Sequence, residues 1–270
     1  MASPKDEHLA LSSGIGLAGL AISNFYEVGR DAFETFREDI IEVIVKPNKT
    51  SAIHWYLAYF QDISREIENI SGNIDEKDFL FNFIYRTLDE VNMIPNLPKP
   101  DFDNCTDNCH ENCICKEKLD IWIEFVEDNS DSINDLIIHS AFQVIFQNRK
   151  FLHDFHLELA NFIEDYIDYI KTAQPDSVTE KNRIKRQRFP KWLINAVLYR
   201  DKGTCSICRC DLSYLLRTQN TIHIDHIIPL GVYGSNDASN FQLLCETCNT
   251  SKGARSTATS SINVPFWNMN

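Results

Sequence analysis

Apolar and polar residues alternate at helical spacing over most of the first 173 residues. The pattern runs through residues 8–45, 53–67, 78–93, 117–127, 130–147 and 149–172, and it predicts amphipathic helices that bury one face. Thr50 or Ser51 can cap the second of these helices. We therefore expect an all-helical domain over residues 1–176.

The pattern changes after residues 174–177, a Gln-Pro-Asp-Ser segment typical of a domain boundary. A short helix is expected over residues 190–203, a strand over residues 221–224, and another short helix after Cys248. Residues 177–270 are therefore expected to form a small second domain, and the fold class is mainly α.

The formal net charge of −13 is unevenly distributed between these two parts. Residues 181–270 hold 12 Lys and Arg against 5 Asp and Glu, whereas residues 1–180 hold 14 against 34. The basic part could bind phosphates, and the acidic part would repel DNA. We expect the acidic part to contact a regulatory protein, another signal or the basic part itself, although a solvated acidic surface would give the same pattern.

Two Cys-x-x-Cys pairs, Cys205 with Cys208 and Cys245 with Cys248, stand about 40 residues apart. In a chain that opens without a secretory signal, such pairs indicate a metal rather than disulfides. Four thiolates close a tetrahedron around Zn²⁺ and leave no open position. The sequence therefore predicts a structural zinc site, with Cys210 as a spare thiol.

Residues able to hold a second metal lie between and after these pairs. Asp225 and His226 follow the expected strand, and Asn249 and Lys252 lie one turn apart on the expected helix. The oxygen atoms of Asp225 and Asn249 suit Mg²⁺ or Mn²⁺ and leave positions for water and phosphate. His226 could deprotonate a water molecule at neutral pH.

These motifs resemble the HNH (ββα-metal) endonuclease family, in its four-cysteine zinc-bearing branch. The resemblance covers about residues 185–256 and is carried by the two Cys pairs, Ile224-Asp225-His226-Ile227-Ile228-Pro229-Leu230, Gly234, Asn240 and Asn249-x2-Lys252-Gly253. It implies a small C-terminal ββα-metal domain that cleaves DNA with one Mg²⁺ or Mn²⁺ ion. Residues 1–180 carry no such resemblance.

The resemblance also implies a role for each matching residue. Asp225 and Asn249 would bind the catalytic ion, and His226 would be the general base. Asn240 would brace the loop between the strands, and Lys252 would contact phosphate. The ion would stabilise the charge that develops on the scissile phosphate and the leaving 3′ oxygen.

A second group of cysteines lies in the polar stretch at residues 101–116 and comprises Cys105, Cys109, Cys113 and Cys115. Zinc is the usual metal of thiolate-rich sites, so these thiols could hold a second ion. The spacing matches no pattern that we can assign. Free thiols, or a site made by three thiols and His110, remain open.

The stretch that leads into the zinc motif is basic and contains Arg183, Lys185, Arg186, Arg188 and Lys191. Because it directly precedes the expected nuclease domain, contact with the DNA backbone is favoured over a solvated linker.

The sequence therefore predicts a metal-dependent DNA endonuclease, controlled by its helical domain in the manner of restriction or phage-defence effectors. A cytoplasmic location without membrane contact is expected, because the longest weakly polar run, residues 9–22, is too short to span a bilayer. One alternative is a zinc-stabilised DNA-binding or adaptor protein without cleavage. Another is a helical HEPN-like ribonuclease using Arg149 and His156, although packed histidines explain that pattern better.

Overall fold

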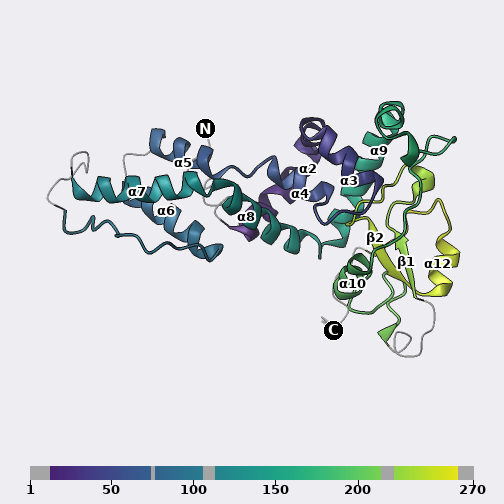
Figure 1. Ribbon diagram of the computed structural model, residues 1–270. Coiled ribbons are helices and arrows are strands. Elements are labelled where there is room, and N and C mark those ends of the chain that lie inside the picture. The colour runs from purple at the N-terminus through teal and green to yellow at the C-terminus, as the bar shows by residue number, and fades with distance from the viewer. Residues whose placement is uncertain (1–12, 74–76, 106–112, 214–221, 261–270) are drawn as a thin grey trace. The chain divides into compact units, whose positions relative to one another are not determined.

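The computed structural model describes residues 13–73, 77–105, 113–213 and 222–260 (Figure 1). The chain forms two compact units, each made from two segments. Unit 1 comprises residues 1–23 and 57–144, and unit 2 comprises residues 24–56 and 145–270. The boundary expected at residues 176–177 lies inside unit 2.

Unit 1 contains helices that pack through their apolar faces. It includes the first turns of α2 (Gly14–Thr35), all of α5 (Ile63–Asn73), α6 (Lys77–Glu90) and α7 (Ile114–Asp128), and nearly all of α8 (Ser130–Ile145). Trp122 is fully buried in its core, and the ring of Phe81 lies edge-on to it with 5.3 Å between the centroids. None of the helices among the described residues is both long and apolar enough to cross a membrane.

One predicted helix is interrupted. The apolar positions over residues 53–67 are divided between α4 (Ala52–Ala58) and α5. The side chain of Asp62 accepts a hydrogen bond from the backbone nitrogen of Arg65 at 3.1 Å, and that of Asn134 accepts one from Ile63 at 3.0 Å. These oxygens satisfy N–H groups that a helix start leaves unpaired, so a new helix begins where the apolar pattern predicts continuity.

The helical part of unit 2 is built around aromatic rings. It contains the rest of α2, then α3 (Arg37–Val45), most of α4 and, later in the chain, α9 (Arg149–Ala173). Phe33 and Phe155 meet edge-on with 5.2 Å between their ring centroids, and so do Phe25 and Phe151. These contacts join α2 to α9, which are far apart in the sequence.

The remainder of unit 2 is a small structure, here called the C-terminal module (residues 175–260). Its described elements are η1 (Pro175–Ser177), α10 (Lys191–Arg200), β1 (His223–His226), η2 (Leu230–Val232), β2 (Phe241–Leu244) and α12 (Glu246–Lys252). The strands pair antiparallel, with Asp225 opposite Gln242 and His226 opposite Phe241. α10 packs on β2, and α12 packs on β1. The predicted fold class, mainly α with a small C-terminal ββα module, is confirmed.

Buried charges join the C-terminal module to α9. The guanidinium of Arg149 donates to Oδ1 of Asp201 at 2.9 Å, and both side chains are almost fully buried. Asp201 also accepts from Nε of Arg200 at 2.8 Å and from the backbone nitrogen of Leu243 at 2.7 Å. Because an unpaired buried charge is costly, this network holds α9, α10 and β2 in one arrangement.

The start of α4 is also held by the C-terminal module. Oδ2 of Asp237 accepts a hydrogen bond from the backbone nitrogen of Ala52 at 2.7 Å. The sequence pattern assigned this capping role to Thr50 or Ser51, but the hydroxyl of Ser51 contacts Nδ1 of His54 at 2.9 Å instead. A long-range carboxylate therefore replaces the local cap.

Candidate active site and metal centre

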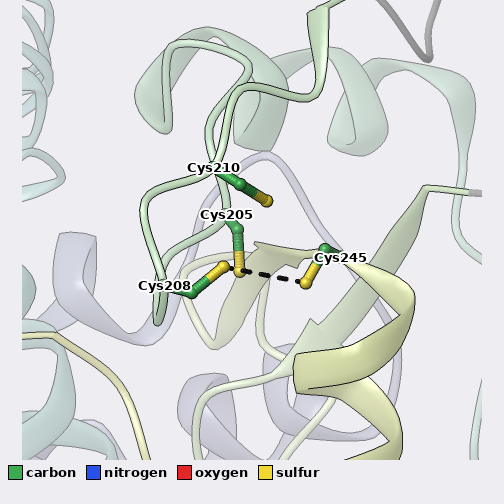
Figure 2. Close-up of side chains that lie close together, drawn as sticks. All are labelled: Cys205, Cys208, Cys210 and Cys245. Atoms are coloured by element: carbon green, nitrogen blue, oxygen red, sulfur yellow. Dashed lines mark hydrogen bonds between the residues drawn. The ribbon is translucent and has the colours of Figure 1, made fainter.

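Thiols gather at one end of the C-terminal module. The sulphur atoms of Cys205, Cys208, Cys210 and Cys245 all lie within 4.8 Å of one another (Figure 2). Those of Cys208 and Cys245 are 3.8 Å apart, close to the separation of about 3.8 Å between two thiolates on a tetrahedral zinc ion. The thiols come from the loop after α10 and from the start of α12, so one ion would bridge these segments.

Cys248 contacts a member of this group. Its backbone nitrogen donates to Sγ of Cys245 at 3.4 Å, which shapes the second Cys-x-x-Cys turn. The backbone amide of Cys210 and the neighbouring thiols lower the pKa of Cys208 to about 6, which favours the thiolate that zinc needs. Desolvation raises the pKa of both Cys210 and Cys248. The direction of the pKa shift therefore does not decide which of these two thiols would be the fourth ligand.

His226 ends β1 and is almost completely buried, with 1% of its surface exposed. Its ring packs 4.6 Å from that of Phe241 and 6.1 Å from that of Phe189, measured between centroids. Burial, followed by the charge of Arg186, lowers the pKa of His226 to about 4. The imidazole is therefore neutral at pH 7 and can accept a proton, as a general base must.

Asp225 points toward α12. Nζ of Lys252 donates to Oδ2 of Asp225 and to the backbone oxygen of His226, each at 2.8 Å. The Lys252 side chain is fully buried and that of Asp225 is 14% exposed. Asn249, half-buried, lies on the same short helix. Lys252, expected to contact phosphate, is thus paired with one of the two expected metal ligands.

Asn240 is fully buried and fastens the loop between the strands. Its Nδ2 donates to the backbone oxygens of Ile228 and Ser235 at 3.0 and 2.9 Å, and its Oδ1 accepts from the nitrogen of Ile228 at 2.9 Å. In the same loop, a Cβ atom on Gly234 would lie 1.9 Å from the oxygen of Ile228, so only glycine fits there. Asn240 holds the chain that follows His226.

The sequence analysis missed Asn236, which is fully buried beside the imidazole. Its Oδ1 lies 3.4 Å from Nε2 of His226. Its Nδ2 donates to the backbone oxygens of Val45 at 3.0 Å and Lys185 at 2.8 Å. A polar residue in a Gly-Ser-Asn-Asp turn normally faces solvent. The hydrogen-bond partners of Asn236 lie 191 and 51 positions away in the sequence, so no local motif indicates that Asn236 is buried.

The basic stretch contains both engaged and exposed side chains. The guanidinium of Arg183 lies 3.5 Å from the centroid of the Tyr233 ring, and its Nε donates to the oxygen of Gly231 at 3.1 Å. The other predicted DNA contacts, Lys185, Arg186, Arg188 and Lys191, are exposed. Arg183 therefore holds the loop that follows β1, and the other four side chains remain accessible.

The second group of cysteines lies in unit 1. The sulphur atoms of Cys105, Cys113 and Cys115 are all within 4.8 Å of one another. Cys109 and His110 lie outside the described residues.

Arg149 and His156 are both buried, with 5% and 1% of their surfaces exposed. Arg149 pairs with Asp201, and Nε2 of His156 lies 2.9 Å from Oγ of Ser239. Burial lowers the pKa of His156 to about 3. Neither side chain is open to RNA, so the ribonuclease alternative gains no support and both residues are explained by packing.

Comparison with known proteins agrees with this geometry. A family model described as HNH endonuclease matches residues 205–255. The match spans the four clustered thiols, Cys248, both strands and α12. No curated protein and no solved structure matches the chain, and the residues before the matched segment stay unassigned.

Proposed function

We propose, from the HNH endonuclease domain at residues 205–255, that this chain is a metal-dependent DNA endonuclease that hydrolyses phosphodiester bonds. The observation that carries the proposal is that β1 ends in Asp225 and His226, while α12, which packs on β1, carries Asn249 and Lys252. A neutral base beside a cation-binding carboxylate is what hydrolysis of a phosphodiester by an activated water needs.

Asp225 and Asn249 would hold one Mg²⁺ or Mn²⁺ ion. Their oxygen atoms suit these hard cations, and the ammonium of Lys252, 2.8 Å from the carboxylate of Asp225, indicates that the place favours positive charge. When bound, the ion supplies charge that stabilises the phosphate and the leaving oxygen. Lys252 would then be positioned to contact the phosphate as well.

The chain's own groups have separate tasks. His226 takes the proton of the attacking water, and Asn240 keeps the loop after His226 in place through three hydrogen bonds. The exposed Lys185, Arg186, Arg188 and Lys191 would neutralise backbone phosphates. Binding should therefore weaken steeply as the salt concentration rises.

The thiol cluster would hold one structural Zn²⁺ through Cys205, Cys208, Cys245 and Cys248. The N–H···S hydrogen bond within the second pair supports Cys248 as the fourth ligand. Cys210, although it lies among the other thiols, would be spare.

The helices preceding the C-terminal module would control the nuclease. Contacts from Ile44, Ala52, Arg149 and His156 reach the module within unit 2. An acidic helical part that repels DNA, or receives a regulatory partner, would restrain cutting until a signal arrives. This organisation suits a cytoplasmic restriction or phage-defence effector.

Incubation of supercoiled plasmid with the full chain over a series of metals tests this function. The enzyme should produce nicked or linear DNA with Mg²⁺ or Mn²⁺, none in EDTA, and ends carrying 5′-phosphate and 3′-hydroxyl. Salt-sensitive binding without turnover in any metal would instead identify the zinc-stabilised DNA-binding protein.

A further inference from the structure

A cluster of three thiols in unit 1 has no part in the nuclease site. The sulphur atoms of Cys105, Cys113 and Cys115 all lie within 4.8 Å of one another. Thiolates on one tetrahedral zinc ion are about 3.8 Å apart, so small side-chain movements would bring all three onto one ion.

The surroundings explain why a metal would be useful there. Residues 91–105, which follow α6, form no helix or strand. Such a long irregular segment has no backbone ladder of its own, so other contacts must hold it in place. Described contacts include Nε1 of Trp122 with the oxygen of Pro98 at 3.1 Å, and Sγ of Cys115 with the oxygen of Asp101 at 3.2 Å. Cys113 is the N-cap of α7 and Cys115 lies in its first turn, so the helix start fixes the positions of both residues.

The geometry points to a second zinc site in unit 1, held by the thiolates of Cys105, Cys113 and Cys115. Three thiolates leave one of the four zinc positions to another ligand. Binding would release the thiol protons and fasten the irregular segment to the first turn of α7. The site would be structural and would act independently of the nuclease.

Zinc content of the full-length chain, measured by plasma mass spectrometry, tests this site. The wild type should carry two zinc ions per chain, and Cys113→Ser/Cys115→Ser should carry one. Lys116→Ser, at the exposed position directly after Cys115, should keep both. Cys205→Ser/Cys208→Ser should lose the other ion.

Two results would overturn the second site. One is a wild type whose zinc content is unchanged by Cys113→Ser/Cys115→Ser. The other is a thiol titration of the denatured, unreduced chain that finds two of these thiols oxidised, which would show a disulfide in place of the metal.

Independently of the thiols, Asn236 connects His226 to two distant segments of unit 2. Its backbone nitrogen donates to the oxygen of Ile44 at 2.8 Å. Its Nδ2 donates to the oxygens of Val45 at 3.0 Å and Lys185 at 2.8 Å. Ile44 and Val45 are the last residues of α3, and Lys185 belongs to the basic stretch.

These bonds determine how the amide of Asn236 is oriented. Both hydrogens of Nδ2 are used by carbonyl oxygens, so Oδ1, which can only accept, faces Nε2 of His226 at 3.4 Å. Nε2 must then carry the imidazole proton, and Nδ1 keeps the lone pair. The amide therefore selects the nitrogen of His226 that can accept a proton.

We infer that Asn236 is a positioning residue that sets the tautomer of His226 and ties it to the end of α3. The role in catalysis rests on the proposed nuclease function, whereas the tautomer does not. A displacement of the end of α3 would move Asn236 first and the imidazole second. The helices would thereby act on the base without touching it.

Imidazole ¹⁵N shifts of the full chain, labelled at histidine and assigned with His226→Ala, test this inference. Wild-type His226 should be the neutral Nε2–H tautomer, and Asn236→Ala should show a mixture of both neutral forms. Ser239→Ala, which removes another buried hydrogen-bonding side chain from the same loop, should leave the tautomer unchanged. In cleavage, Asn236→Ala should lower kcat about tenfold or more with little change in KM.

Failure of the positioning role and failure of the nuclease proposal would give different results. A wild-type Nδ1–H tautomer, or an unaltered tautomer and kcat in Asn236→Ala, would overturn the positioning role. If the wild type cleaves no DNA, the nuclease proposal fails, and the imidazole shifts still decide whether Asn236 sets the tautomer.

Discussion

Nζ of Lys252 lies 2.8 Å from Oδ2 of Asp225, so the carboxylate proposed to bind the catalytic ion already has a buried cationic partner. Lys252 belongs to α12 and Asp225 to β1. The same ammonium donates to the backbone oxygen of His226 at 2.8 Å. The pair fastens α12 to β1, and a divalent ion would have to share or replace this contact.

Lys252→Met should therefore destabilise unit 2 more without added Mn²⁺ than with it. Removing one partner of a buried ion pair costs about 3–5 kcal/mol, and the 14% exposure of the Asp225 side chain should reduce that cost. A bound ion would replace the missing positive charge. Urea unfolding in both conditions measures the difference.

Lys150→Met is the matched control, because the ion pair between Lys150 and Asp154 is much more exposed. It should change the urea midpoint little in either condition. An equal loss of stability for Lys252→Met with and without Mn²⁺ would contradict a cation site at Asp225.

His156→Gln should make unit 2 less sensitive to acid. Burial lowers the pKa of His156 to about 3 in the folded chain, against about 6.5 when unfolded. Its contribution to stability is therefore complete above about pH 6.5 and is lost toward pH 3, by about 1.4 kcal/mol per pH unit. Unfolding free energies across this range should fall less steeply in the variant, and parallel curves would show that His156 is not buried in its neutral form.

A fragment containing only residues 177–270 should fold poorly. It would lose the partners of Asp201, Asp237 and Ser239 on α9 and α4, and the partner of Asn236 on α3. Each buried group left unpaired costs about 1–3 kcal/mol. Amide dispersion in nuclear magnetic resonance spectra, with zinc present, would check this. A fragment that unfolds cooperatively at the temperature of the full chain would show instead that the module is independent.

Cys248→Ser should lose the zinc of the C-terminal module, whereas Cys210→Ser should keep it. The N–H···S bond between Cys248 and Cys245 favours Cys248 as the fourth ligand, although it is Cys210 whose sulphur atom lies within 4.8 Å of those of Cys205, Cys208 and Cys245. Zinc content and thermal stability of the two variants decide between them. The reverse result would assign the fourth position to Cys210.

The segment that the HNH endonuclease model matches could be recognised because its motifs are local in sequence. Each of its motifs joins residues that are three positions apart or fewer, as in the pairs Cys205 with Cys208, Asp225 with His226, and Asn249 with Lys252. The expected helices followed from apolar periodicity. Where the helix boundaries differ from the predicted ones, a side chain from a distant residue is often the cause. For example, the side chain of Asn134 accepts a hydrogen bond from the backbone nitrogen of Ile63, where α5 begins.

Long-range polar contacts could not be predicted in the same way. Asp237 caps α4 from 185 positions away, and Asn236 contacts Val45 from 191 positions away. Neither residue stands out in the sequence, because Asn and Asp in a turn are ordinarily explained by local backbone geometry. These contacts also explain why a boundary at residues 176–177 does not coincide with the edge of a compact unit.

The proposed nuclease function is tested most directly by the rate at which wild type and His226→Ala cleave supercoiled DNA. Both proteins are saturated with Mg²⁺ or Mn²⁺ and compared under single-turnover conditions. The variant should be slower by about 100-fold or more, with its zinc content and unfolding midpoint retained. Equal rates for the two proteins in every metal, or cleavage by the wild type that persists in EDTA, would contradict a metal-dependent nuclease that uses His226 as its base.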